Sequence, residues 1–329
     1  MTTPLLEVSD LWVTYESRSL LGRRRTDAVK GATLTINPGE TLGLVGESGS
    51  GKSSIANTIL GLVAPSRGTM RFDGTDLAAL KTRYPEAVRR QIQAVFQDPY
   101  SSLNPSMTVE EIVTEPLRVH TTLTKAERRA RAAEILRMVS LNEDHLDRRP
   151  HQFSGGQRQR IAIAAALALQ PRLIVLDEPV SALDVSTQNQ IINLLYERRD
   201  ALGMAYLLIA HDLALVHHIS DRIAVMYLGH IVEEGPASRV YHQPAHPYTK
   251  ALLDAVPLLD PAAQRRRRAA RRLAPAPDVQ RVADTGCPYR NRCPQAMARC
   301  AALPPAFAVP GGGTASCFLL DRETVEATP

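Results

Sequence analysis

The chain has 329 residues, of which 44% are hydrophobic and 22% charged, and it carries a formal net charge of +5. This composition excludes a disordered chain and is sufficient for one large globular domain with an appendage. Its longest apolar run, Ile161 to Leu169, is shorter than the roughly 20 residues of a membrane-spanning helix, and Met1 to Pro4 do not begin a signal peptide. We therefore expect a cytosolic protein that reaches a membrane only through partner proteins.

The N-terminal part of the chain predicts a small antiparallel β-subdomain. Leu5 to Tyr15 has the pattern of an extended strand, and Ala32 to Ile36 alternates before a turn. Gly68 to Phe72 predicts a third, short strand. The run Arg23 to Arg25 is interpreted as solvated loop charge.

A phosphate-binding loop is predicted directly after the largely apolar run Thr41 to Val45. The loop has the pattern G-x-x-x-x-G-K-[ST] and leads into a helix; its residues are Gly46, Glu47, Ser48, Gly49, Ser50, Gly51, Lys52 and Ser53, followed by Ser54. A strand, a glycine loop and a helix in this order direct backbone N–H groups at a phosphate chain. We expect Lys52 to reach the β- and γ-phosphates of a nucleotide and the Ser53 hydroxyl to ligate Mg²⁺.

The pattern between Ser101 and Pro150 changes to helical, with apolar residues on one face among charged neighbours. This stretch predicts an inserted helical subdomain at about residues 100–165. At its end, Ser154, Gly155, Gly156 and Gln157 precede the buried helix predicted over Ile161 to Leu169. Taken alone, a Ser-Gly-Gly run before a helix is a weak signal, because any helix N-cap with a flexible approach looks similar.

Strands and helices then alternate, which predicts an α/β core. Leu173 to Leu176 and Tyr206 to Ala210 read as buried strands with a helix over Thr187 to Leu202 between them. Asp177 and Glu178 end the first of these strands, at the sheet edge where α/β folds bind ligands. Asp177 would hold Mg²⁺ and Glu178 would orient or polarise an attacking water; the simpler alternative is that the pair caps the following helix.

The C-terminal part carries all four cysteines of the chain, Cys287, Cys293, Cys300 and Cys317. A Pro-, Ala- and Arg-rich stretch places the domain boundary near Pro261, giving domains of 1–260 and 261–329. Disulfides are not expected in a cytosolic protein. The wide spacing favours a [4Fe–4S] cluster over zinc, and zinc over unligated thiols, and we expect a structural role for it.

Phe153 to Gln157, standing between the phosphate loop and the Asp177–Glu178 pair, resembles the Leu-Ser-Gly-Gly-Gln signature of the ATP-binding cassette family, with Phe153 in place of leucine. The resemblance extends over most of residues 5–257. It implies that Gln97 is the Q-loop glutamine near the metal, that Ser181 to Asp184 is the D-loop, that His211 contacts the γ-phosphate and that Tyr15 stacks on adenine. A lone Gln97 or His211 could instead be a satisfied core residue, and Tyr15 could pack within the β-subdomain.

The family resemblance also implies how two such chains work together. Two cassettes close head to tail around two ATP molecules, so that Ser154 and Gly156 of one face the γ-phosphate at Lys52 of the other. Closing and opening then drive attached membrane subunits. The expected fold is a P-loop α/β ATPase core with an antiparallel β-subdomain, an inserted helical subdomain and a small cysteine-rich extension.

A narrower resemblance rests on Phe96 to Pro105 and His246 to Leu253, which are similar to segments of ATPase subunits of bacterial dipeptide, oligopeptide and nickel importers. It implies two transmembrane permease subunits, a related second ATPase in a heterodimer and an extracytoplasmic peptide-binding protein, on the cytoplasmic face of the membrane. The solute, peptide or nickel, stays open. The rival hypotheses are a soluble cassette ATPase acting on nucleic acid or ribosomes, which we do not favour, and a redox sensor built on the four cysteines.

Overall fold

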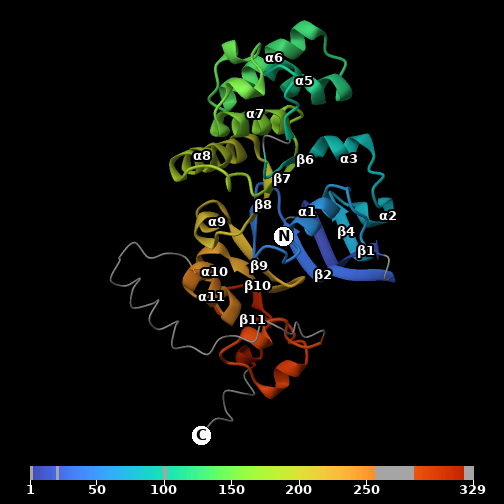
Figure 1. Ribbon diagram of the computed structural model, residues 1–329, viewed down its shortest axis with the longest axis vertical. Helices are drawn as coiled ribbons and strands as arrows, with labels where there is room; N and C mark the ends of the chain where they lie inside the picture. Colours follow the sequence, from blue (N-terminus) through green and yellow to red (C-terminus); the bar gives the residue numbers. More distant parts are fainter. Residues whose placement is uncertain (1–2, 20–21, 99–101, 256–284, 322–329) are drawn as a thin grey trace.

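Parallel strands form the centre of the larger of two β-sheets in the computed structural model, which describes residues 3–19, 22–98, 102–255 and 285–321 (Figure 1). The strand order of this sheet is β11-β12-β10-β9-β3-β8-β7-β6. Strands β9, β3, β8, β7 and β6 run parallel, and β3 and β8 are buried along their whole length, as expected for strands covered on both faces. The strand bounds are β3 (Thr41–Val45), β6 (Ile92–Val95), β7 (Leu173–Asp177), β8 (Ala205–Ala210), β9 (Arg222–Tyr227), β10 (His230–Pro236), β11 (Phe307–Ala308) and β12 (Thr314–Ala315).

The smaller sheet is antiparallel, as predicted, with the order β2-β1-β4-β5. Its strands are β1 (Leu6–Ser19), β2 (Gly22–Ile36), β4 (Arg67–Phe72) and β5 (Thr75–Asp76). The prediction of a loop at Arg23 to Arg25 was wrong. These residues belong to β2 and pair with Arg18, Ser17 and Glu16 of β1, because the hairpin ladder satisfies their backbone regardless of side-chain charge.

Helices connect the strands and cover the larger sheet. Two of them begin earlier than their apolar patterns indicated, α7 at Gly155 and α8 at Val185, because Ser154 and Asp184 act as N-caps. The helices around the sheets are α1 (Lys52–Ile59), α2 (Leu77–Leu80), α3 (Glu86–Gln91), α7 (Gly155–Leu167), α8 (Val185–Leu202), α9 (Leu213–Ile219), α10 (Ala237–His242) and α11 (Pro247–Ala255).

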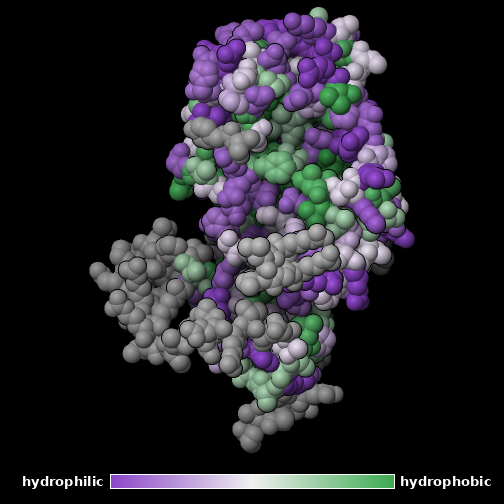
Figure 2. Space-filling model, turned by 45° about the vertical axis from the view of Figure 1, so that its right-hand side comes forward, coloured by the Kyte–Doolittle hydropathy of each residue, from purple (hydrophilic) through white to green (hydrophobic). Residues whose placement is uncertain are grey.

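Helices α5 (Val109–His120) and α6 (Lys125–Met138) lie against α7 at one end of the molecule (Figure 1). Each begins with a capping box, in which Thr108 pairs with Glu111 and Thr124 with Glu127. Short 3-10 turns, η1 (Glu143–His145) and η2 (Pro150–Gln152), lead from α6 to α7. The surface at this end is mostly hydrophilic in Figure 2. No helix in the described part of the chain combines the length and apolarity needed to cross a bilayer.

Strands β9 and β10 form a hairpin, and its turn contacts both the phosphate loop and the antiparallel sheet. Leu228 and Gly229 have φ angles of 45° and 91°, the positive values that a tight two-residue hairpin turn requires. The Gly229 N–H donates to the Ser50 carbonyl in the phosphate loop at 2.9 Å, and its carbonyl accepts from Lys30 of β2 at 2.8 Å. The hairpin therefore ties the loop to the antiparallel sheet.

The C-terminal segment, residues 285–321, lies at the opposite end of the molecule from α5 and α6 (Figure 1). It contains the 3-10 turns η3 (Arg290–Arg292), η4 (Ala298–Ala301) and η5 (Phe318–Leu320), and the two-residue strands β11 and β12. Strand β12 pairs antiparallel with β10, so this segment extends the larger sheet. The domain boundary predicted near Pro261 and the arginines from 265 to 272 lie outside the described residues.

Candidate functional site

Four loops that follow the carboxyl ends of neighbouring parallel strands form the candidate site. The phosphate loop follows β3, Gln97 follows β6, Glu178 follows β7 and His211 follows β8. The strands are in register, since Val45 pairs with Ala210, Asp177 with Ile209 and Val95 with Leu176. The residues that follow them are therefore delivered to one edge of the sheet, where open α/β sheets bind their ligands.

The phosphate loop has the close backbone packing that its glycines allow. Gly51 has a φ of 109°, and a Cβ there would lie 2.3 Å from the Ala28 carbonyl oxygen. A Cβ on Gly46 would lie 2.1 Å from the carbonyl oxygen of Met226. Only glycine fits at either position, and the loop leads directly into α1, whose N-terminal N–H groups favour an anion.

The Lys52 side chain folds back over this loop. Its Nζ donates to the carbonyl of Gly46 at 2.7 Å and of Glu47 at 2.9 Å. Burial lowers the pKa of Lys52, although the nearby carboxylates of Glu178, Asp177 and Glu47 act to raise it. A bound phosphate would supply the negative charge that this buried ammonium lacks within hydrogen-bonding distance.

Ser53 and Asp177 lie together at the position expected for Mg²⁺. The Ser53 hydroxyl donates to Oδ1 of Asp177 at 3.4 Å. Burial raises the pKa of Asp177, and the neighbouring Glu178 carboxylate adds to this rise. Mg²⁺ prefers hard oxygen ligands. A hydroxyl and a carboxylate next to a phosphate loop are such ligands, so the side chains of Ser53 and Asp177 suit this ion.

The predicted catalytic residues converge on one carboxylate oxygen. Gln97 Nε2 donates to Glu178 Oε2 at 2.9 Å, and His211 Nδ1 lies 3.6 Å from the same oxygen. Glu178 has a φ of 48°, and its backbone N–H donates to the Ile209 carbonyl, which fixes the turn after β7. Glu178 does not simply cap a following helix: it is held between Gln97 and His211, which suits a group that orients a water.

A cavity of about 510 Å³ connects these groups. Its lining residues from the predicted site are Ser48, Gly49, Gly51, Lys52, Ser53, Ser54, Gln97, Glu178 and His211. Its size is within the usual range for small-molecule sites. Tyr15 lies beside it: the ring is 41% exposed, and its hydroxyl donates to the Ser54 hydroxyl at 3.3 Å.

The signature residues and Asp184 are not among the residues that line this cavity. Ser154 is exposed and forms a capping box with Gln157 at the start of α7. A Cβ on Gly156 would lie 2.4 Å from Thr187 Cγ2, and one on Gly155 would lie 3.3 Å from Leu183. Asp184 accepts from the N–H and hydroxyl of Thr187, and these bonds lower its pKa. These contacts place the signature residues against α8.

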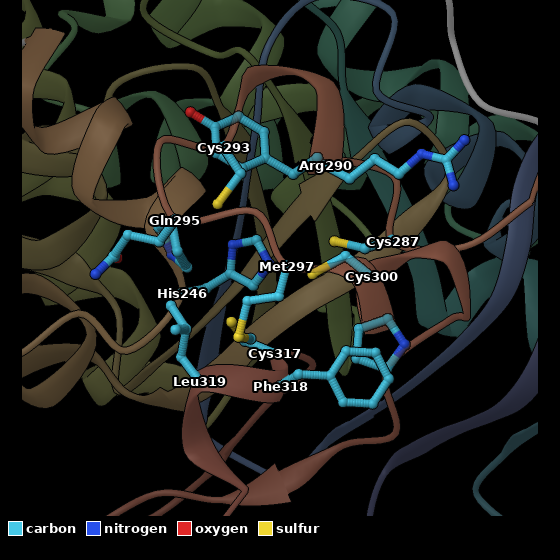
Figure 3. A pocket seen from close by; sticks show the side chains of 13 residues that line it. His246, Cys287, Arg290, Cys293, Gln295, Met297, Cys300, Cys317, Phe318 and Leu319 are labelled. Atoms are coloured by element: carbon cyan, nitrogen blue, oxygen red, sulfur yellow. The ribbon is translucent and has the colours of Figure 1, made fainter. Parts of the chain in front are cut away.

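The four cysteines line one pocket in the C-terminal segment (Figure 3). All four are free thiols, and Figure 3 shows their sulfur atoms directed toward a shared space. Burial raises the pKa of Cys287 to about 11, with a further contribution from the other three thiols. Among the described residues, no group of three or more His, Cys, Asp or Glu side chains stands at metal-binding spacing.

The same pocket contains a buried polar atom without a hydrogen-bond partner, which indicates what kind of group could bind there. His246 is 1% exposed, and its Nε2 has no hydrogen-bond partner. Its Nδ1 accepts from the Tyr248 N–H at 3.0 Å, so the neutral ring carries its proton on Nε2. An orphaned donor beside four thiols has the chemistry of a metal–thiolate site, but the free space of about 10 Å³ holds no more than one water-sized group.

The sequence did not indicate two residues that contact the phosphate loop from the C-terminal side, or a third that packs against them. Arg292 and Tyr248 both bind Glu47, and Tyr227 lies against them. Tyr248 belongs to the stretch His246 to Leu253, which stood out only through its resemblance to importer ATPases. Glu47 and Arg292 are 245 residues apart in the chain, so no local sequence pattern indicates their contact.

The fold and the site together define an ATP-hydrolysing P-loop protein of the ATP-binding cassette class. The sequence matches the family described as ABC transporter over residues 29–181, and the family described as Oligopeptide/dipeptide transporter, C-terminal region, over residues 232–300. The chain belongs to the ABC transporter family, in the group whose ATP-binding proteins carry this C-terminal region.

Similar proteins support the same assignment. The chain is 47% identical over 299 residues to a putative oligopeptide transport ATP-binding protein, YkfD, of Bacillus subtilis, covering 90% of this chain and 89% of YkfD. It is 46% identical over 325 residues to the oligopeptide transport ATP-binding protein OppF of Salmonella typhimurium, covering 96% of both. The cassette MJ0796, solved as a dimer bound to ADP and Pi, is 32% identical with a TM-score of 0.62, covering 70% of this chain and 98% of MJ0796.

Proposed function

We propose that this chain is the ATP-hydrolysing subunit of a transporter that imports dipeptides or oligopeptides across the cytoplasmic membrane. The observation that carries the proposal is the meeting of Gln97 and His211 at the Glu178 carboxylate, beside a phosphate loop. The names of the relatives, oligopeptide transport ATP-binding proteins, support peptides as the solute. A nickel importer is the alternative within the same family.

The residues of the site divide the work of hydrolysis. The N–H groups of the loop and of α1 cradle the phosphates, and Lys52 turns from the Gly46 and Glu47 carbonyls to the β- and γ-phosphates. Ser53 and Asp177, with Gln97 near them, would hold Mg²⁺, which supplies charge neutralisation when bound. Glu178 orients the attacking water, while Gln97 and His211 hold its carboxylate in place and His211 stands ready for the γ-phosphate.

We further propose that a second cassette completes the site. Ser154, Gly155, Gly156, Gln157 and Asp184 would contact the ATP held by the partner, and the exposed position of Ser154 supports this. The exposed ring of Tyr15 would stack on adenine. We expect the partner to be a related but different ATPase, so that the pair is a heterodimer.

The membrane partners of the proposed complex are two permease subunits, served by an extracytoplasmic peptide-binding protein. The chain would bind them from the cytoplasmic face. Helix α5 is the first α-helix after Gln97 in the described chain, and together with α6 and α7 of the helical subdomain proposed at about 100–165 it would pass the position of Gln97 to the permeases. The division into residues 1–260 and a C-terminal extension, 261–329, stays part of this proposal.

The four-cysteine pocket is proposed to hold a [4Fe–4S] cluster, with Zn²⁺ as the alternative. The convergence of four free thiols and the orphaned Nε2–H of His246 support a metal–thiolate group. When bound, such a group would cross-link the turns of a segment that has few large apolar residues. The pocket would have to widen around a four-iron cluster, whereas a single ion needs less space.

The test of this function uses the whole complex, purified without oxygen from cells that express the chain with its neighbouring permease and ATPase subunits. ATP hydrolysis is measured with the peptide-binding protein, with and without peptide, and nickel replaces peptide in a parallel assay. Stimulation by peptide supports the proposal. Stimulation by nickel alone would select the alternative, and purification without permeases together with a response to nucleic acid would refute both.

The metal content of the same preparation tests the cysteine site. Iron and acid-labile sulfide in equal amounts, with an absorbance band lost in Cys300→Ser, would support the cluster. Zinc without sulfide would select the alternative. Absence of both metals from protein that hydrolyses ATP normally would show that the thiols are unligated.

A further inference from the structure

Two residues from the C-terminal half of the chain bind Glu47 of the phosphate loop. The Glu47 backbone N–H donates to the hydroxyl of Tyr248 at 2.9 Å. The Glu47 carboxylate accepts from Arg292 Nη1, also at 2.9 Å. Tyr248 lies in α11 and Arg292 in η3, so two separate parts of the C-terminal half of the chain bind the backbone and the side chain of one loop residue.

Arg292 is held in a fixed position by aromatic rings. Its guanidinium carbon lies 5.8 Å from the ring centres of both Tyr227 and Tyr289. Tyr248, which is fully buried, packs on Tyr227 with ring centres 4.5 Å apart. The guanidinium stays charged, because an arginine side chain is not deprotonated in proteins. The guanidinium is therefore a rigid, permanent positive charge facing the Glu47 carboxylate.

Glu47 in turn contacts the residues that bind phosphate. Its carbonyl accepts from Lys52 Nζ at 2.9 Å and from the Ser50 N–H at 3.1 Å. The orientation of the Glu47 peptide therefore helps to set where the lysine and the loop N–H groups point. Glu47 is the one acidic residue of the loop sequence Gly46 to Ser53, and its carboxylate, if unpaired, would repel a bound phosphate chain.

Both contacts connect to the four-cysteine pocket within one or two residues. Arg292 immediately precedes Cys293. Tyr248 follows His246 by two residues, and the His246 ring accepts the Tyr248 N–H. His246 and Cys293 both line the pocket (Figure 3). The pocket and the phosphate loop are thus joined by two short, independent connections.

We propose that Arg292 and Tyr248 are positioning residues of the ATP site, through which the four-cysteine segment controls the affinity for ATP. Arg292 neutralises the Glu47 carboxylate and holds it away from the phosphates. The Tyr248 hydroxyl fixes the Gly46–Glu47 peptide, whose carbonyl, that of Gly46, accepts from Lys52 Nζ at 2.7 Å. Neither residue touches the reacting atoms, so their effect appears in binding and not in the chemical step. This proposal rests on ATP hydrolysis and is independent of the transported solute.

The test is a double-mutant cycle in the assembled complex, reading KM for ATP and kcat separately. Arg292→Gln should raise KM about two- to fivefold, the size expected for a partly exposed ion pair, with kcat unchanged. Glu47→Gln removes the carboxylate that Arg292 neutralises, so its own KM, whatever its value, is the reference for the second half of the cycle. Arg292→Gln added to Glu47→Gln should then have little further effect, and Arg292→Lys should restore most of the affinity.

Tyr248→Phe tests the second contact without a change in charge. It removes only the hydroxyl and keeps the buried ring, and KM should rise about threefold because the Glu47 N–H loses its acceptor. Arg299→Gln is the matched control, since Arg299 pairs with Asp321 at 2.6 Å within the same segment. Its KM should equal that of the wild type.

Three results would overturn the proposal. The first is an unchanged KM in both Arg292→Gln and Tyr248→Phe. The second is an additive effect of Arg292→Gln in the Glu47→Gln background. The third is a rise of KM in Arg299→Gln as large as that in Arg292→Gln, which would mean that the segment acts only through general stability.

Discussion

The side-chain amide of Gln97 donates a hydrogen bond to the Glu178 carboxylate over 2.9 Å. Gln97 follows β6, next to the segment that leads into α5, whereas Glu178 follows β7 and carries the proposed chemistry. A shift of the Gln97 loop would therefore move or release the carboxylate directly. Through this contact a change near α5 could reach the proposed hydrolytic site.

Replacing the proposed water-orienting residue should separate hydrolysis from binding. Glu178→Gln keeps the shape of the side chain and removes its basicity, so kcat should fall about 10²- to 10⁴-fold. ATP binding should persist, because Lys52 and the loop are unchanged. Single-turnover hydrolysis and equilibrium ATP binding check this, with the exposed Glu115→Gln of α5 as control. If Glu178→Gln had the kcat of the wild type, Glu178 would not take part in hydrolysis.

The buried lysine of the phosphate loop should determine the affinity for ATP. Lys52→Ala removes a charged donor from the site, and affinity should fall at least about tenfold, as expected for hydrogen bonds to charged groups. Titration calorimetry with ATP and Mg²⁺ measures the change. Lys125→Ala, on the exposed first residue of α6, is the control and should bind as the wild type does. Equal affinity in both variants would contradict the role of Lys52.

A buried ion pair should support the start of α11. The Glu233 side chain is fully buried; it accepts from Arg239 and from the N–H groups of Ala245 and His246 at 2.9 and 2.8 Å. Glu233→Ala leaves a buried guanidinium without its counter-charge and two N–H groups without their acceptor, which should cost about 3–5 kcal/mol of unfolding free energy. Urea denaturation checks this. Glu115→Ala removes an exposed carboxylate and is the control, so its Tm should equal that of the wild type. A drop in Tm as large as that of Glu233→Ala would contradict the claim that the burial of Glu233 causes the loss of stability.

His230 should make the protein less stable in acid. Burial lowers its pKa to about 4, and Lys30 adds to this effect. Between the ordinary histidine pKa of about 6.5 and about 4, the unfolded chain binds a proton that the folded chain does not. The stability contributed by neutral His230 is therefore complete above pH 6.5 and is lost as the pH falls toward 4.

The measurement for His230 is the free energy of unfolding against pH for the wild type and for His230→Gln. The difference between the two curves should shrink as the pH is lowered through this window, because glutamine does not titrate. Parallel curves would show that His230 has the same pKa in both states.

The parts of the site that could be predicted are those encoded in contiguous stretches. Gly46 to Ser53 follows a strand and precedes a helix, so both its structure and its ligand follow from local pattern. Asp177 and Glu178 could be placed because they end an apolar strand. Gln97 and His211 have no such pattern, and only the family resemblance indicated them.

The parts that could not be predicted depend on tertiary contact. Glu47 is one of the positions that the phosphate-loop pattern leaves open, and nothing near Arg292 or Tyr248 marks them as its partners. The start of α7 was missed for a different reason. The capping box of Ser154 and Gln157 was present in the sequence, but the prediction followed the apolar run that begins at Ile161. Two-residue strands such as β12 are too short to show the alternation of apolar and polar residues by which a strand is recognised.

The pairing of β12 with β10 bears on the solubility of the protein. Glu233 and Glu234 of β10 pair with Ala315 and Thr314, and the Ser316 N–H donates to the Val232 carbonyl at 2.8 Å. A cassette cut before this segment would present the β10 backbone as an open sheet edge, which invites strand exchange with other molecules. The C-terminal residues thus shield the chain from self-association, so a shortened version would need a new cover for β10.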